Sequence, residues 1–114
     1  MLFYKDPDSG QIHAYREETV DQYLQPGLVA ISDSEYQEFI DQQALTVSKG
    51  EEGLWVAAQL REAAEQILML DDDDPAAMPG TTVADWRGYR VALRAWKDGA
   101  EGFPGRQYRP RRPQ

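Results

Sequence analysis

The sequence predicts an α+β fold in which a small β-rich unit precedes helices. Short aromatic and β-branched runs, separated by turn-forming residues, occupy the first third of the chain. Apolar residues at helical spacing occupy much of the rest. A proline- and glycine-containing acidic stretch interrupts the pattern. We therefore expect an N-terminal α+β domain over residues 1–70, a flexible acidic linker over 71–80, and a C-terminal helix with a basic, proline-rich tail over 81–114.

Three strands are expected near the N-terminus. Residues 2–4 and 12–15 are aromatic and β-branched runs, and the turn formers between them include Pro7 and Gly10. Proline presets φ and glycine accepts a positive φ, so this cluster predicts a hairpin. After Pro26 and Gly27, residues 28–31 predict a short third strand.

A helix is expected from Ser32 onward. Ser32 and Glu35 have the spacing of a capping box, in which a hydroxyl and a carboxylate bind the free N–H groups of a first helical turn. Tyr36, Phe39 and Ile40 follow on one face of this helix. We expect that face to pack on the sheet.

The middle of the chain allows two interpretations. Residues 45–47 and 54–56 flank a loop bounded by Gly50 and Gly53, which favours a second hairpin because valine and tryptophan prefer strands. Alternatively, a helix that begins near residue 54 already includes Trp55. From residue 57 the pattern is helical, with one apolar stripe. The stripe consists of Ala57, Leu60, Ala64, Ile67 and Leu68.

The last expected helix follows the four aspartates and two prolines of residues 71–80. Thr82 and Asp85 resemble a helix cap. Apolar residues recur at helical spacing, and a basic stripe follows the same spacing one residue later. The apolar set is Trp86, Tyr89, Leu93 and Trp96, and the basic set is Arg87, Arg90, Arg94 and Lys97. The tail from residue 102 contains four arginines and too few apolar residues to fold alone.

Charge is distributed unevenly along the chain. Residues 1–85 contain 18 acidic and 4 basic side chains, whereas residues 86–114 contain 2 acidic and 8 basic ones. Such asymmetry indicates either two surfaces for different partners, or a basic end that pairs with an acidic domain. The acidic domain would repel DNA, so we expect no nucleic-acid partner.

No residue pattern points to catalysis. His13 is the single histidine and the chain lacks cysteine. No serine lies in a nucleophile-elbow pattern, and no phosphate-binding glycine loop is present. The aspartates at 71–74 lack the alternating ligand spacing of a calcium loop. We expect no enzymatic activity, no cofactor and no metal.

Two segments resemble phage assembly proteins. Residues 85–94, followed by Gly102-Phe103-Pro104, resemble the phage tail assembly chaperone-like domain. That family typically has a Trp, a Tyr-Arg pair, an Ala-Leu-Arg run and then Gly-Phe-Pro. It often finishes with a Trp-Pro pair, where this chain has Tyr108-Arg109-Pro110.

The N-terminal segment is similar to phage tail-fibre assembly proteins. Those proteins open with two aromatic strands around a turn, a Pro-Gly, a short apolar strand and a Ser-x-x-Glu helix. The matching residues here are Tyr4, Gly10, Tyr15, Pro26-Gly27-Leu28, Ile31-Ser32 and Glu35-Tyr36.

The resemblance implies a chaperone that assists folding, trimerisation or attachment of a tail or tail-fibre protein in the cytoplasm of a bacterial host. A minor virion tail component, or an acidic regulatory protein that binds a host protein, is the alternative. We expect no membrane partner, because no apolar run approaches the length of a membrane span.

Aromatic and arginine side chains are typical of binding hot spots. The expected partner-binding residues are Trp86, Tyr89, Arg90, Trp96 and Phe103. The rival expectation is that Trp86, Tyr89 and Trp96 only anchor the last helix to its own domain.

Overall fold

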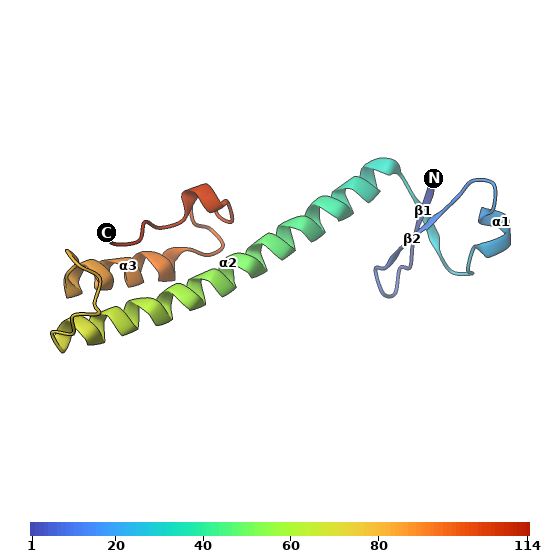
Figure 1. Cartoon of the computed structure of the whole chain (residues 1–114). Coiled ribbons are helices and arrows are strands. Elements are labelled where there is room, and N and C mark those ends of the chain that lie inside the picture. Colours follow the sequence, from blue (N-terminus) through green and yellow to red (C-terminus); the bar gives the residue numbers. More distant parts are fainter. The chain divides into compact units, whose positions relative to one another are not determined.

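The predicted α+β class is confirmed in a computed structural model that describes all 114 residues. The chain divides into two compact units, Met1–Ala44 and Leu45–Gln114. Figure 1 shows the elements in chain order. They are β1 (Leu2–Lys5), β2 (Ile12–Tyr15), α1 (Val20–Tyr23), β3 (Val29–Ile31), α2 (Asp33–Asp71), α3 (Val83–Ala95) and the 3₁₀ turn η1 (Arg106–Tyr108).

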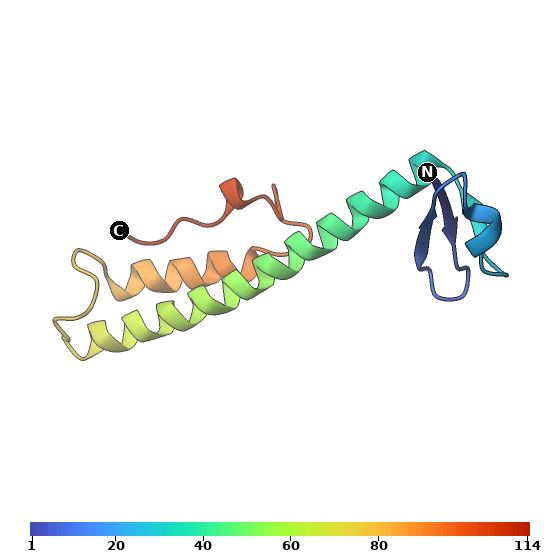
Figure 2. The same ribbon diagram turned by 45° about the vertical axis from the view of Figure 1, so that its right-hand side comes forward.

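The first unit contains a three-stranded antiparallel sheet in the order β2-β1-β3. Leu2 lies opposite Tyr15 across the hairpin, whose loop is visible in Figure 2. In the loop, the N–H of Gly10 donates to the carbonyl of Asp6 at 2.8 Å, and Gly10 has the positive φ that the sequence predicted. On the other side of β1, Phe3 lies opposite Ile31. The predicted hairpin and third strand are therefore confirmed.

The start of α2 contacts the sheet through Tyr36, whereas Ile40 of the same expected face is 37% exposed. The Ser32 hydroxyl accepts a hydrogen bond from the Glu35 N–H at 3.1 Å, which caps the helix. The Tyr36 ring stacks on Phe3 with ring centroids 3.8 Å apart. Val20, at 8% exposed, is the one buried residue of this unit, and most strand residues are only half-buried. The first unit thus has a sheet but little core.

The hairpin favoured for residues 45–56 is wrong, because α2 runs without interruption through this stretch. Gly50 and Gly53 lie inside the helix, where each costs about 1 kcal/mol relative to alanine. Trp55 and Val56 pack against the core of the second unit, and Glu52 is buried beside them. Burial of these side chains by segments far along the chain outweighs the local preference for a strand.

The second unit is built on a helical hairpin, with α3 lying beside the C-terminal half of α2 in both views (Figures 1 and 2). Its buried cluster consists of Ala63, Ile67, Trp86, Tyr89 and Leu93. The Thr82 hydroxyl and the Asp85 carboxylate form the predicted cap of α3. The apolar stripe predicted from residue 57 divides in two: Leu60 and Ile67 pack inward, whereas Leu68 is 64% exposed.

The stretch expected to be a flexible linker, residues 71–80, lies within the second unit. The Met78 N–H donates to the side-chain oxygen of buried Gln66 at 2.9 Å. The Thr81 hydroxyl donates to the Met78 carbonyl at 2.8 Å and accepts from the Trp86 indole at 3.0 Å. These bonds connect the stretch to both helices, and its mobility stays a prediction.

A membrane span requires roughly 20 mostly apolar residues in succession. Neither of the two long helices contains a stretch of that kind.

We expect Leu93→Ala to lower the free energy of unfolding of the second unit by about 2–5 kcal/mol, because Leu93 is fully buried and its truncation leaves a cavity. Denaturant unfolding followed by tryptophan fluorescence measures this, since all three tryptophans lie in the second unit. The control is Val91→Ala, at a side chain that is 65% exposed. Equal losses in the two variants would contradict the assigned core.

Candidate functional site

The C-terminal residues 104–114, which we call the strap, run back along the hairpin of α2 and α3 (Figures 1 and 2). The strap has no regular structure apart from η1. Its side chains are instead held by arginine–glutamate pairs with α2. Charge pairing with α2 therefore contributes to the position of these eleven residues.

Glu52 is the centre of this arrangement. Its side chain is 1% exposed, yet it is ionisable. One carboxylate oxygen accepts from the Trp96 indole at 3.0 Å and from Arg109 Nε at 2.7 Å, while the other accepts from Arg109 Nη2 at 2.5 Å. This two-point contact is the strong geometry for an arginine–carboxylate pair. It joins α2, the end of α3 and the strap.

Further contacts extend the pairing in both directions. The Arg109 guanidinium also lies over the Trp55 ring, 4.3 Å from the ring centroid. Arg106 pairs with Glu51 at 3.2 Å, and Arg112 pairs with Glu62. Three of the four strap arginines are thus neutralised by α2 carboxylates. Of the two alternatives given for the uneven charge, this pairing corresponds to the one in which the basic end of the chain pairs with acidic residues before it.

The electrostatics follow from this geometry. The Arg109 hydrogen bonds lower the pKa of Glu52 below its ordinary value, and they outweigh the opposing effect of burial. In return, Glu52 raises the pKa of Arg109. Burial raises the pKa of Tyr89, whose hydroxyl donates to the Gln59 side chain at 2.7 Å. Glu52 is therefore held as a buried carboxylate at neutral pH.

The Gly102-Phe103-Pro104 motif turns the chain from α3 into the strap. Gly102 has φ +81°, and a Cβ atom there would lie 2.2 Å from Cγ of Tyr108. Only glycine fits at this position. The Phe103 ring packs edge-on against Trp96 with centroids 5.1 Å apart, and the Phe103–Pro104 peptide is cis.

The five predicted partner-binding residues occupy two kinds of position. Trp86, Tyr89 and Trp96 are 0%, 4% and 6% exposed, so they anchor α3 to its own unit, as the rival expectation holds. Arg90 and Phe103 are half-buried. The buried Nε atom of Arg90 has no hydrogen-bond partner. Of the five, Arg90 and Phe103 keep surface that another molecule could contact.

Sequence reasoning missed Glu52 and its arginine partner. The sequence did contain a signal, because Arg106, Arg109 and Arg112 recur every three residues. Arginines at this spacing can lie on one side of the strap and each pair with a carboxylate. In the hairpin expected for residues 45–56, Glu52 would lie in an exposed loop rather than against the strap.

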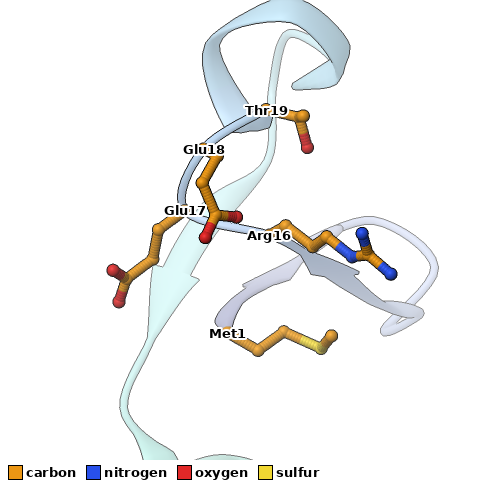
Figure 3. A pocket seen from close by; sticks show the side chains of 5 residues that line it. All are labelled: Met1, Arg16, Glu17, Glu18 and Thr19. Carbon is orange, nitrogen blue, oxygen red and sulfur yellow. The ribbon is translucent and has the colours of Figure 1, made fainter.

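The first unit has a cavity of its own. A surface cavity of about 610 Å³ in the first unit is lined by Met1, Arg16, Glu17, Glu18 and Thr19. Figure 3 shows that the Arg16 and Glu17 side chains point in opposite directions. No three histidine, cysteine or acidic side chains converge as metal ligands would, and the Asp74 carboxylate instead accepts from the Ala76 N–H at 2.8 Å.

Acid should destabilise the second unit through Glu52. Because its pKa is lower in the folded chain than the ordinary value of 4.5, ionised Glu52 stabilises the fold above that pH. The contribution is lost as the pH falls through the folded pKa. Denaturant unfolding between pH 7 and pH 3 should show a steep acid decline in the parent and a flatter one in Glu52→Gln. The control is Glu101→Gln, at an exposed turn, which should decline like the parent.

Gly102→Ala should displace the strap, since the added methyl group collides with the Tyr108 ring. We expect a loss of stability of about 1–3 kcal/mol and faster amide hydrogen exchange in residues 104–114. Gly53→Ala is the matched control, because open space surrounds that helical position and alanine should stabilise the helix by about 1 kcal/mol. Unchanged exchange in Gly102→Ala would exclude the assigned role of the turn.

Comparison of the chain with protein-family models, curated proteins and solved structures found no match.

Proposed function

We propose that this protein is an assembly chaperone that binds a phage tail or tail-fibre protein and assists its folding, trimerisation or attachment. The observation that carries the proposal is the first unit, which presents a sheet with two open edges and almost no core of its own. The motifs that resemble phage assembly proteins occur in both units.

The edges of the sheet are suited to hold another strand. β1 is the central strand, so β2 and β3 each leave one side without a strand partner. Val29 on β3 is 55% exposed, and nearby Tyr23 and Leu24 are 66% and 39% exposed. An edge strand presents unpaired N–H and C=O groups, and an extended peptide can join it by backbone hydrogen bonds. Exposed apolar side chains would then contact the added segment.

This geometry fits a shielding mechanism. Fibre and tail proteins rich in β-structure expose apolar surface and unpaired strands before they assemble, and such surface aggregates. A strand of the unassembled partner that pairs with β2 or β3 is protected until its own neighbours replace the chaperone. The low burial of the first unit supports the same interpretation, because the bound strand supplies the apolar contacts that the unit lacks.

The second unit has a different role in this proposal. Trp86, Tyr89 and Trp96 are buried and maintain its fold. The main role of the motif that resembles the chaperone family is therefore to stabilise the second unit. Arg90 and Phe103 are the residues of the original set that would contact the partner. In this proposal no side chain of the second unit takes part in a chemical reaction.

The test is co-expression of the full chain with a phage tail-fibre protein. We expect the parent to raise the yield of soluble, trimeric fibre, and Val29→Glu to reduce that yield several-fold by placing a charge on the edge strand. Val91→Glu is the matched control, since it makes the same change at a 65% exposed position on α3. Circular dichroism of each variant checks that the fold persists.

Three outcomes would contradict the proposal. The fibre could reach the same soluble yield without this protein. The variants Val29→Glu, Arg90→Ala and Phe103→Ala could all rescue it fully. The protein could also remain stoichiometric in finished particles, which would make it a tail component.

A further inference from the structure

Two arginines of the strap are held by the helices in the same way. The Arg109 guanidinium pairs with a carboxylate of α2 and lies over a tryptophan ring, 4.3 Å from its centroid. The Arg112 guanidinium also pairs with a carboxylate of α2 and lies over a tryptophan ring, 5.5 Å from its centroid. A planar guanidinium both pairs with carboxylates and stacks on aromatic rings, so both positions suit arginine. The four helical residues that make these contacts, which we call the strap site, are Glu52, Trp55, Glu62 and Trp86.

The backbone of the strap gives its paired arginines a common direction. Arg106–Tyr108 is a 3₁₀ turn, and Arg109 continues it in an extended conformation with φ −56° and ψ 146°. The 3₁₀ helix and the polyproline II helix both have three residues per turn, so side chains three apart lie on one side. Arg109 and Arg112 each precede a proline, which favours the extended conformation. The strap site therefore suits an extended segment with the pattern Arg-Pro-x-Arg-Pro.

The strap is attached to the helices through its side chains. Its backbone hydrogen bonds run to itself or to the turn before it, from Gly105 to Gly102 at 2.7 Å and from Tyr108 to Gly105 at 3.0 Å. The Arg106 side chain is 71% exposed in its pair with Glu51, and a pair so exposed contributes little. A surface cavity of about 310 Å³ remains between the last residues of the strap and α3. Another extended segment could therefore make the same contacts and fill the site more completely.

The buried carboxylate of Glu52 decides which segments can take the place of the strap. Glu52 is 1% exposed, and removal of Arg109 alone would leave its charge unpaired and out of water. A second arginine restores the two-point contact, whereas an apolar or acidic side chain does not. Glu51 and Glu62 add negative charge at the same surface of α2, which attracts a basic segment.

We propose that the strap site binds an extended Arg-Pro-x-Arg-Pro segment of another protein, and that the strap is a tethered competitor for it. A short tether holds the strap at an effective concentration of about millimolar, so the strap occupies the site until a tighter or abundant segment replaces it. The proposal concerns residues of the second unit alone and does not rest on the chaperone function.

The first test measures binding of a fluorescent peptide with the sequence of residues 104–114 to the full chain, by anisotropy. We expect Arg109→Gln in the chain to bind the peptide about tenfold or more tightly than the parent does, because its own strap competes less. Arg111→Gln is the matched control, since it removes the same charge from an exposed strap residue outside the paired series and should bind like the parent.

Circular dichroism checks that the Arg109→Gln chain keeps its helices. If it does not, Arg112→Gln replaces it with the same expected direction, because that pair is more exposed, at 37% for each side chain.

The second test examines the chemistry and the place of binding. A peptide with lysine in place of both paired arginines keeps the charge but loses the two-point contact and the ring stacking, so its affinity should fall about tenfold or more. In the parent, excess peptide should speed amide hydrogen exchange in residues 104–114 while α3 stays protected.

Four results would overturn the proposal. The lysine peptide could bind as tightly as the arginine peptide. The Arg109→Gln chain, or Arg112→Gln in its place, could fold normally and bind no more tightly than the parent. Exchange of the strap could stay unchanged at saturating peptide. Sedimentation equilibrium could also show a dimer of the parent that Arg109→Gln abolishes, which would assign the site to the strap of a second copy.

Discussion

The second unit depends on the buried carboxylate of Glu52, which is 1% exposed and joins three segments of the chain. A charge removed from water costs several kcal/mol unless it is paired and hydrogen-bonded. The indole of Trp96 and the two-point contact of Arg109 supply that pairing. The end of α3 and the strap must therefore close on α2 together, which explains how a tail with few apolar residues takes a defined course.

Features governed by nearby residues could be predicted from the sequence. The hairpin around Gly10 and the caps at Ser32 and Thr82 each depend on residues within a few positions, and each occurs as expected. Residues 45–56 could not be predicted in this way. Their helical state depends on contacts of Glu52 with Trp96 and Arg109, which lie 44 and 57 residues further along the chain.

The same distinction applies to the candidate site. Helical spacing placed Trp86, Tyr89 and Leu93 on one face, and that face is the core. Spacing alone could not show that α2 covers this face. The sequence therefore could not distinguish a face that anchors α3 in its own unit from a face that binds a partner. The sheet edges of the first unit are left open, since β2 and β3 each have a strand partner on one side only.

The dependence of the second unit on Glu52 and Arg109 is measured most directly by a double-mutant cycle. Unfolding free energies of the parent, Glu52→Gln, Arg109→Gln and the double variant give the coupling between the two side chains. A buried, two-point charged contact predicts a coupling of about 2 kcal/mol or more. Losses that simply add, with a coupling near zero, would show that the strap is held by other contacts and would contradict the account.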